Sequence, residues 1–119
     1  MSIEIIKPAD IEKKSFSIIS EILGDRTFDP LQEPIIKRAI HTSADFDYAD
    51  NLYFSQGVVS QLLDAIRQGA DIVTDTQMAK AGISKKTLQR FGGQVHCFIS
   101  DEDVAREAKE RGVTRAVVS

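Results

Sequence analysis

The apolar residues in the first part of the chain recur with helical spacing. Over residues 10–23 they lie three, four and seven positions apart, which predicts a helix with Asp10 as its N-cap and Gly24 just after its end. A second helix is predicted over residues 31–41. Its regular part is expected to begin near Pro34, because proline is tolerated only in the first turn of a helix.

One polar residue interrupts the apolar face of the first predicted helix. Ser15 shares this face with Ile11, Ile18, Ile19 and Ile22. Its hydroxyl either bonds back to a carbonyl one turn earlier, which is the common arrangement, or it belongs to a face that overlooks a ligand. The spacing alone leaves both interpretations open.

After the second helix the pattern changes to short apolar strands that alternate with helices. The predicted strands cover residues 52–54, 72–74 and 95–99, and the predicted helices cover residues 55–66, 76–81, 84–91 and 101–111. This alternation is typical of an α/β fold with a parallel sheet, right-handed crossovers and helices on both faces. In such sheets a ligand lies beyond the carboxyl ends of the strands.

Few residues stand where chemistry is expected. His41 is near the C-terminus of its helix, where the dipole favours a protonated imidazole, so it is either a proton donor or a side chain that satisfies free carbonyls. Asp75, after the second strand, either binds a ligand or caps the next helix. His96 is expected to be structural, and Cys97 is expected in the core, because adjacent strand residues point to opposite faces. These residues lack the spacing of a metal site.

Composition and charge narrow the class of protein. The chain has 119 residues, of which 42% are apolar, and we expect one domain over residues 1–119. The net charge of −3, with both signs interspersed, argues against nucleic-acid binding. A single cysteine, no leader-like start and no long apolar run predict a cytoplasmic protein that does not span a membrane. No glycine-rich nucleotide-binding motif is present.

Four dispersed segments resemble one known family. They are residues 12–19 (EKKSFSII), residues 37–45 (KRAIHTSAD), residues 75–78 (DTQM) with Gly82 behind them, and residues 112–115 (GVTR). In order and spacing they are similar to precorrin-8X methylmutase, the precorrin isomerase of cobalamin biosynthesis, and the resemblance runs from about Ile6 to Ser119.

The resemblance implies a fold and a reaction. The implied fold is a three-layer α/β/α, flavodoxin-like domain with a mostly parallel sheet, which forms a homodimer and binds a corrinoid at the subunit interface. The implied reaction moves a methyl group from carbon 11 to carbon 12 of the macrocycle, giving hydrogenobyrinate or cobyrinate, without a cofactor. His41 matches the catalytic histidine, expected to protonate the macrocycle near ring C. The alternative is a non-catalytic flavodoxin-like module that binds corrinoids or dimerises.

The resemblance also assigns substrate contacts. Ser15 matches a position near the substrate, and Thr114 and Arg115 match a pair suited to substrate carboxylates, for which arginine offers a planar fork. Asp75 and Met78 are carried over as further substrate-binding residues. Family members continue through a Gly-Asn-Ala-Pro type segment and further strands that this sequence lacks. The chain therefore resembles the N-terminal half of the family or slightly more, and part of the sheet and pocket is expected to be missing.

Overall fold

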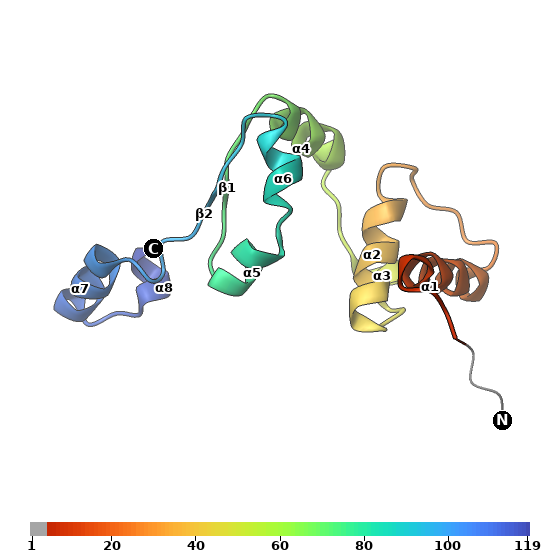
Figure 1. Ribbon diagram of the computed structural model, residues 1–119, viewed down its shortest axis with the longest axis horizontal. Coiled ribbons are helices and arrows are strands. Elements are labelled where there is room, and N and C mark those ends of the chain that lie inside the picture. The colour runs from red at the N-terminus through yellow and green to blue at the C-terminus, as the bar shows by residue number, and fades with distance from the viewer. Residues whose placement is uncertain (1–4) are drawn as a thin grey trace. The chain divides into compact units, whose positions relative to one another are not determined.

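The computed structural model describes residues 5–119, which fall into two compact units. The first unit ends at Ser60 and the second spans Gln61–Ser119. The regular elements of the described part of the chain are helices and one pair of strands, which loops connect (Figure 1). In chain order they are α1 (Pro8–Leu23), α2 (Glu33–Ser43), α3 (Tyr48–Asn51), α4 (Val58–Arg67), β1 (Ile72–Val73), α5 (Gln77–Gly82), α6 (Lys85–Gln89), β2 (Val95–His96), α7 (Glu102–Arg111) and α8 (Arg115–Val118).

The first unit is built on the packing of α1 against α2, which lie side by side in Figure 1. Its core consists of Ile19 from α1 and Ile36 and Ile40 from α2, with Ile40 only 1% exposed. Partly buried side chains surround this centre: Leu23, Phe28, Phe46, Ala49, Leu52 and Phe54. Burial of an isoleucine side chain stabilises a fold by roughly 1.5–3 kcal/mol, so this small cluster fixes how α1 and α2 meet.

The helix starts differ in how well the sequence predicted them. The structure contradicts Asp10 as the first N-cap: the N-cap position is held by Lys7, three residues earlier, and α1 begins at Pro8. Proline is favoured there because its missing N–H would have no partner in that turn. Asp10 lies in the first turn, where its charge complements the helix dipole. The predicted start of the second helix near Pro34 is confirmed, since α2 begins at Glu33.

The predicted strand at residues 52–54 is wrong. The segment is extended at Leu52, but it pairs with no strand in the described residues. Its alternating pattern has another origin, because Leu52 and Phe54 pack on the helical core of the first unit while Tyr53 is 87% exposed. A period of two therefore reports burial on one side of an extended chain, whether or not that chain belongs to a sheet.

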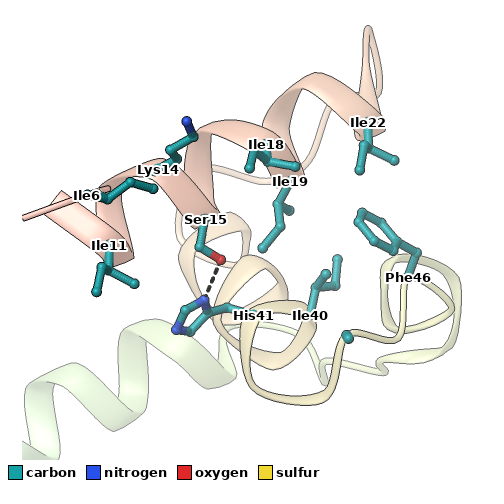
Figure 2. Close-up of a pocket in the computed structure, with 11 residues that line it drawn as sticks. Ile6, Ile11, Lys14, Ser15, Ile18, Ile19, Ile22, Ile40, His41 and Phe46 are labelled. Atoms are coloured by element: carbon teal, nitrogen blue, oxygen red, sulfur yellow. Dashed lines mark hydrogen bonds between the residues drawn. The ribbon is translucent and has the colours of Figure 1, made fainter. Parts of the chain in front are cut away.

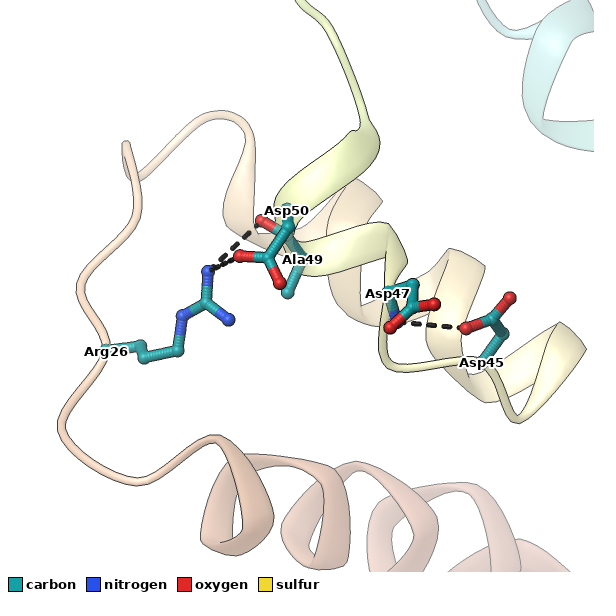
Figure 3. Close-up of polar contacts among 5 residues, drawn as sticks. All are labelled: Arg26, Asp45, Asp47, Ala49 and Asp50. Atoms are coloured by element: carbon teal, nitrogen blue, oxygen red, sulfur yellow. Dashed lines mark hydrogen bonds and ion pairs between the residues drawn. The ribbon is translucent and has the colours of Figure 1, made fainter.

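Polar contacts hold the connections of the first unit in place (Figure 3). The Arg26 guanidinium pairs with the Asp50 carboxylate and donates to the carbonyl of Ala49 at 3.4 Å, which ties the loop after α1 to α3. The Asp45 carboxylate accepts from the backbone N–H of Asp47 at 2.9 Å and shapes the turn that enters α3.

The second unit contains a parallel ladder of two short strands. Ile72 pairs with Val95 and Val73 with His96, so the predicted parallel arrangement is confirmed for β1 and β2, both shorter than expected. Gly93 permits the close approach of the chain before β2. A Cβ there would lie 2.6 Å from the carbonyl oxygen of Ala70 and 2.9 Å from a carbon of Leu88.

The helices of the second unit match most of the predicted boundaries. Asp101 is at the N-cap position of α7, and Gly112 ends that helix in the left-handed conformation at φ +64°. The cap of α5 is Thr76, whose hydroxyl accepts from the N–H of Ala79 at 3.1 Å. Cys97 is buried, as expected. Within residues 5–119 no helix is both long enough and apolar enough to cross a membrane.

Candidate functional site

The packing of α1 on α2 brings together two of the predicted site residues. Ser15 lies midway along α1 and His41 lies in the last turn of α2. The Ser15 Oγ is 2.7 Å from the Nδ1 of His41, and both side chains are half-buried (Figure 2). This contact contradicts the interpretation in which the hydroxyl bonds back to a carbonyl of its own helix, because it faces a titratable ring on a second helix. The interpretation in which Ser15 overlooks a ligand stays a prediction.

The Ser15 hydroxyl can serve His41 in more than one protonation state. A hydroxyl donates to the Nδ1 of a neutral imidazole or accepts from the N–H of an imidazolium, and its hydrogen rotates to suit. The other ring nitrogen, Nε2, points away from Ser15 in Figure 2. Within residues 5–119, Nε2 has no hydrogen-bond partner. Every buried side-chain nitrogen or oxygen in that range has a partner, so Nε2 is not buried and is accessible. A ring held at one nitrogen and open at the other suits proton transfer.

A second set of contacts surrounds the His41 ring. The rings of Phe16 and His41 are stacked, with centroids 5.0 Å apart and planes inclined by 23°. The Arg38 guanidinium carbon lies 4.8 Å from the centroid of Phe16, and Arg38 pairs with Glu12 at 2.6 Å. These residues come from the same faces of α1 and α2 that carry Ser15 and His41.

Beside the two residues lies a hollow with a volume of about 350 Å³. Six isoleucines dominate its lining, and Ser15 and His41 form part of its wall (Figure 2). The lining residues are Ile6, Ile11, Lys14, Ser15, Ile18, Ile19, Ile22, Ile40, His41, Ala44 and Phe46. Ile11, Ile18 and Ile22 are each about half exposed or more, so the α1 side of the hollow presents apolar surface to solvent.

The other predicted site residues belong to the second unit. Asp75 lies past the carboxyl end of β1, as expected, and is exposed. Its alternative role as a helix cap is wrong, because the cap of α5 is the neighbouring Thr76. Met78 is 84% exposed on α5. Thr114 and Arg115 are exposed at the start of α8, where Thr114 holds the N-cap position without a side-chain capping bond.

The second histidine has a partner that the sequence did not reveal. The Nε2–H of His96 donates to the Asp71 carboxylate at 2.9 Å, and the backbone N–H of Gln94 donates to the other oxygen at 2.9 Å. The hydrogen bond from His96, and after it the one from Gln94, hold the pKa of Asp71 below its usual value of 3.8. Desolvation opposes this effect, and the charge of His96 adds a smaller lowering. His96 also stacks on Phe98, with ring centroids 5.9 Å apart. The pair joins the start of β1 to β2, which agrees with the structural role expected for His96.

Sequence reasoning missed Glu12, Phe16 and Arg38. A signal was available, because Arg38 lies three residues before His41 on one helix, and Glu12 lies three before Ser15 and four before Phe16 on the other. These spacings make the side chains neighbours on a helix surface. Spacing within a helix does not show which face meets the partner helix, so their contacts with each other could not be predicted. Among residues 5–119, no three His, Cys, Asp or Glu side chains are grouped so that they could hold a metal ion.

Known proteins are similar to this chain over nearly its whole length. The family model for precorrin-8X methylmutase matches residues 10–119. A cobalt-precorrin-8 methylmutase of Salmonella typhimurium is 48% identical over 97% of this chain and 57% of its own length. Another from Priestia megaterium is 40% identical over 96% of this chain and 51% of its own length.

A solved structure is also similar to this chain over most of the chain's length. The crystal structure of a precorrin-8X methyl mutase from Thermus thermophilus matches with a TM-score of 0.76 at 35% identity, and covers 91% of this chain and 53% of that one. The chain thus spans about half the length of the relatives that it matches. Its own fold is a mixture of helices and strands with a small parallel sheet, and this fold is similar to the solved structure. Together, these matches show that the chain belongs to the precorrin-8X methylmutase family.

Proposed function

We propose that the chain carries the proton-donating site of a corrin isomerase. In this reaction a methyl group moves from carbon 11 to carbon 12 of precorrin-8X or cobalt-precorrin-8, giving hydrogenobyrinate or cobyrinate. The observation that carries the proposal is the contact of 2.7 Å between Ser15 Oγ and His41 Nδ1 beside an apolar hollow, in a chain whose family is named for this activity.

His41 acts as the acid through Nε2. Its imidazolium donates the Nε2 proton to the macrocycle near ring C, which makes the ring electron-deficient and favours a suprafacial methyl shift. Ser15 accepts from the Nδ1–H throughout this step, so the hydrogen bond survives the loss of the other proton. Substrate and product are isomers, so the proton returns after the migration and none is consumed. General acid catalysis of this kind contributes roughly 10²–10⁴-fold in rate.

The hollow is one wall of the proposed substrate site. Its volume of about 350 Å³ is at the small end of ligand pockets, which span roughly 300–1,000 Å³, so it receives an edge of the macrocycle and not the whole. Its isoleucines suit the methyl-bearing carbon framework, whereas the carboxylate side chains need charged partners. We assign Thr114 and Arg115 to these carboxylates, and Asp75 and Met78 to further substrate contacts.

The proposal extends to the assembly. We place residues 1–119 in one precorrin isomerase domain of the three-layer, flavodoxin-like class, acting as a cytoplasmic homodimer. The parallel pairing of β1 with β2 supports a sheet that continues beyond these two strands, since a two-stranded ladder is marginal alone. The exposed apolar residues of α1 support a covered interface.

Corrin absorption spectra and turnover test this function. The chain is mixed with hydrogenobyrinic acid to follow binding and with precorrin-8X to follow the isomerisation, and His41→Ala is compared with His96→Ala as the matched control. We expect the spectral shift to disappear in His41→Ala and turnover to fall by at least about a hundredfold, whereas His96→Ala keeps both. Unchanged turnover in His41→Ala refutes the proton donor. Binding without turnover in the unaltered chain favours the alternative of a non-catalytic corrinoid-binding module, and no spectral shift at high protein concentration excludes both.

A further inference from the structure

A single hydrogen bond does not fix the plane of the His41 ring. Rotation about the terminal side-chain bond of His41 displaces Nδ1, so the contact with Ser15 limits this rotation, but a hydrogen bond tolerates a broad range of angles and the torsion itself has only a weak preference. Delivery of a proton requires Nε2 to be aimed at the acceptor, because a misplacement of about 1 Å can cost roughly a hundredfold in rate. A second contact on the ring is therefore needed for a defined orientation.

Phe16 supplies this second contact. Its ring is stacked on the imidazole at a centroid distance of 5.0 Å with an inclination of 23°, within the range in which aromatic pairs attract each other. The stacked geometry restricts rotation of the imidazole, because a turn about its terminal bond would push one edge into the phenyl ring. Ser15 and Phe16 are neighbours on α1. One turn of that helix therefore holds the Nδ1 atom of His41 through Ser15 and the plane of its ring through Phe16.

Arg38 in turn restrains Phe16. Its guanidinium carbon lies 4.8 Å from the phenyl centroid, within the limit of about 6 Å for a cation–π contact. Glu12 holds Arg38 by an ion pair of 2.6 Å between Oε1 and Nη2. Both members of this pair are more than half exposed, and such pairs contribute only about 0–1 kcal/mol to stability. The ion pair between Glu12 and Arg38 by itself therefore adds little to stability.

We propose that Phe16 and Arg38 are positioning residues that hold the plane of the His41 imidazole, with Glu12 fixing Arg38. The consequence for turnover rests on the proposed function, whereas the effect on ring orientation does not. The other role open to Arg38 is to bind a substrate carboxylate directly, and the experiment separates the two.

The orientation of His41 is measured by NMR on the chain labelled at histidine. The chain has two histidines, so His96 provides an internal reference. Phe16→Leu keeps an apolar side chain but removes the aromatic ring, Phe16→Tyr restores the ring, and Arg38→Gln removes the cation. Lys37→Gln is the matched control, because Lys37 precedes Arg38 on α2 and pairs with Glu33 at 2.8 Å.

We expect Phe16→Leu to move the His41 ring signals toward their random-coil positions while those of His96 stay in place. Phe16→Tyr should preserve the His41 signals, and Arg38→Gln should weaken the cross-peaks between the Phe16 and His41 rings. Amide signals of Ile36 and Ile40 report whether each variant keeps its fold. Unchanged His41 signals in the folded Phe16→Leu variant, or an equal change in Lys37→Gln, would overturn the proposal.

Kinetics with precorrin-8X then assign the role of Arg38. A positioning role predicts that Arg38→Gln lowers kcat by up to about a hundredfold and leaves KM unchanged. A raised KM at unchanged kcat would assign Arg38 to the substrate and remove it from the proposal. If His41→Ala keeps full turnover, the proposed function fails, while the NMR result still decides whether Phe16 and Arg38 orient the ring.

Discussion

The packing of α2 on α1 should depend more strongly on one of two adjacent isoleucines than on the other. Ile36 is 4% exposed in the core of the first unit, whereas Ile35, its neighbour on α2, is 42% exposed. Replacement by alanine removes three carbon atoms in each case. Because both positions are helical, alanine gains the same few tenths of a kcal/mol of helix propensity at each, and this gain cancels from the comparison.

The expected losses follow from burial. At about 0.8 kcal/mol for each buried carbon, Ile36→Ala loses roughly 2.3 kcal/mol of transfer free energy, and the cavity left behind raises the total to about 3 kcal/mol. Ile35→Ala loses only about 1.4 kcal/mol, because less than two thirds of that side chain is removed from water and no closed cavity forms. The difference in the free energy of unfolding should therefore be about 1.5 kcal/mol.

Urea unfolding followed by tyrosine fluorescence measures this difference in the first of the two structural units. The chain has two tyrosines and no tryptophan, and both Tyr48 and Tyr53 lie in the first unit. The slope of the free energy against urea should be the same for both variants, so that the midpoints report stability alone. If the losses agree to within about 0.5 kcal/mol, the assignment of Ile36 to the core that joins Ser15 to His41 is refuted.

Three further predictions concern the second unit. The lowered pKa of Asp71 means that its carboxylate stabilises the fold above the usual value of 3.8 and ceases to do so as the pH falls through the lower folded-state pKa. Thermal unfolding should therefore show Asp71→Asn to be less stable than the unaltered chain near pH 7, with a difference that shrinks as the pH falls below 3.8, and a loss that does not change with pH would contradict the pairing with His96. Gly93→Ala would place a Cβ 2.6 Å from a backbone oxygen and should cost about 1–3 kcal/mol, whereas Gly82→Ala meets nothing within 4 Å and should cost almost nothing; circular dichroism on heating compares them. Thr76→Ala should remove about 1 kcal/mol through loss of the α5 cap, and an unchanged melting temperature would show that the hydroxyl does not cap the helix.

The helices were largely predictable from the spacing of apolar residues. The stripe on the first helix, Pro34 near the start of α2 and Gly112 after α7 are local signals, because each depends on backbone geometry within one or two turns. The errors were local as well. At the first helix Pro8 displaced Asp10 from the cap, and at residues 52–54 an extended chain packed on helices gave the same alternation as a strand.

The candidate site was predicted less completely. His41 and Ser15 were identified from a helix-end position, an interrupted apolar stripe and a family resemblance, but not as partners of each other. The sequence did not predict the contacts of Asp71 or those of Glu12, Phe16 and Arg38. These contacts join residues that are 22 to 26 positions apart or lie on separate helices. No periodicity within one element contains that information.

The sequence by itself determined the helical segments, the parallel pairing of two strands and the family, and it singled out His41 as a candidate. These depend on local backbone preferences, on the period of burial and on motifs that stand in order along the chain. Only the tertiary structure decided that the Ser15 hydroxyl meets Nδ1 of His41, that Phe16 stacks on its ring, and that Arg38 covers Phe16. The physical reason is that Ile19, Ile36 and Ile40 fix the angle and register at which α1 meets α2, and this packing sets which polar side chains come into contact.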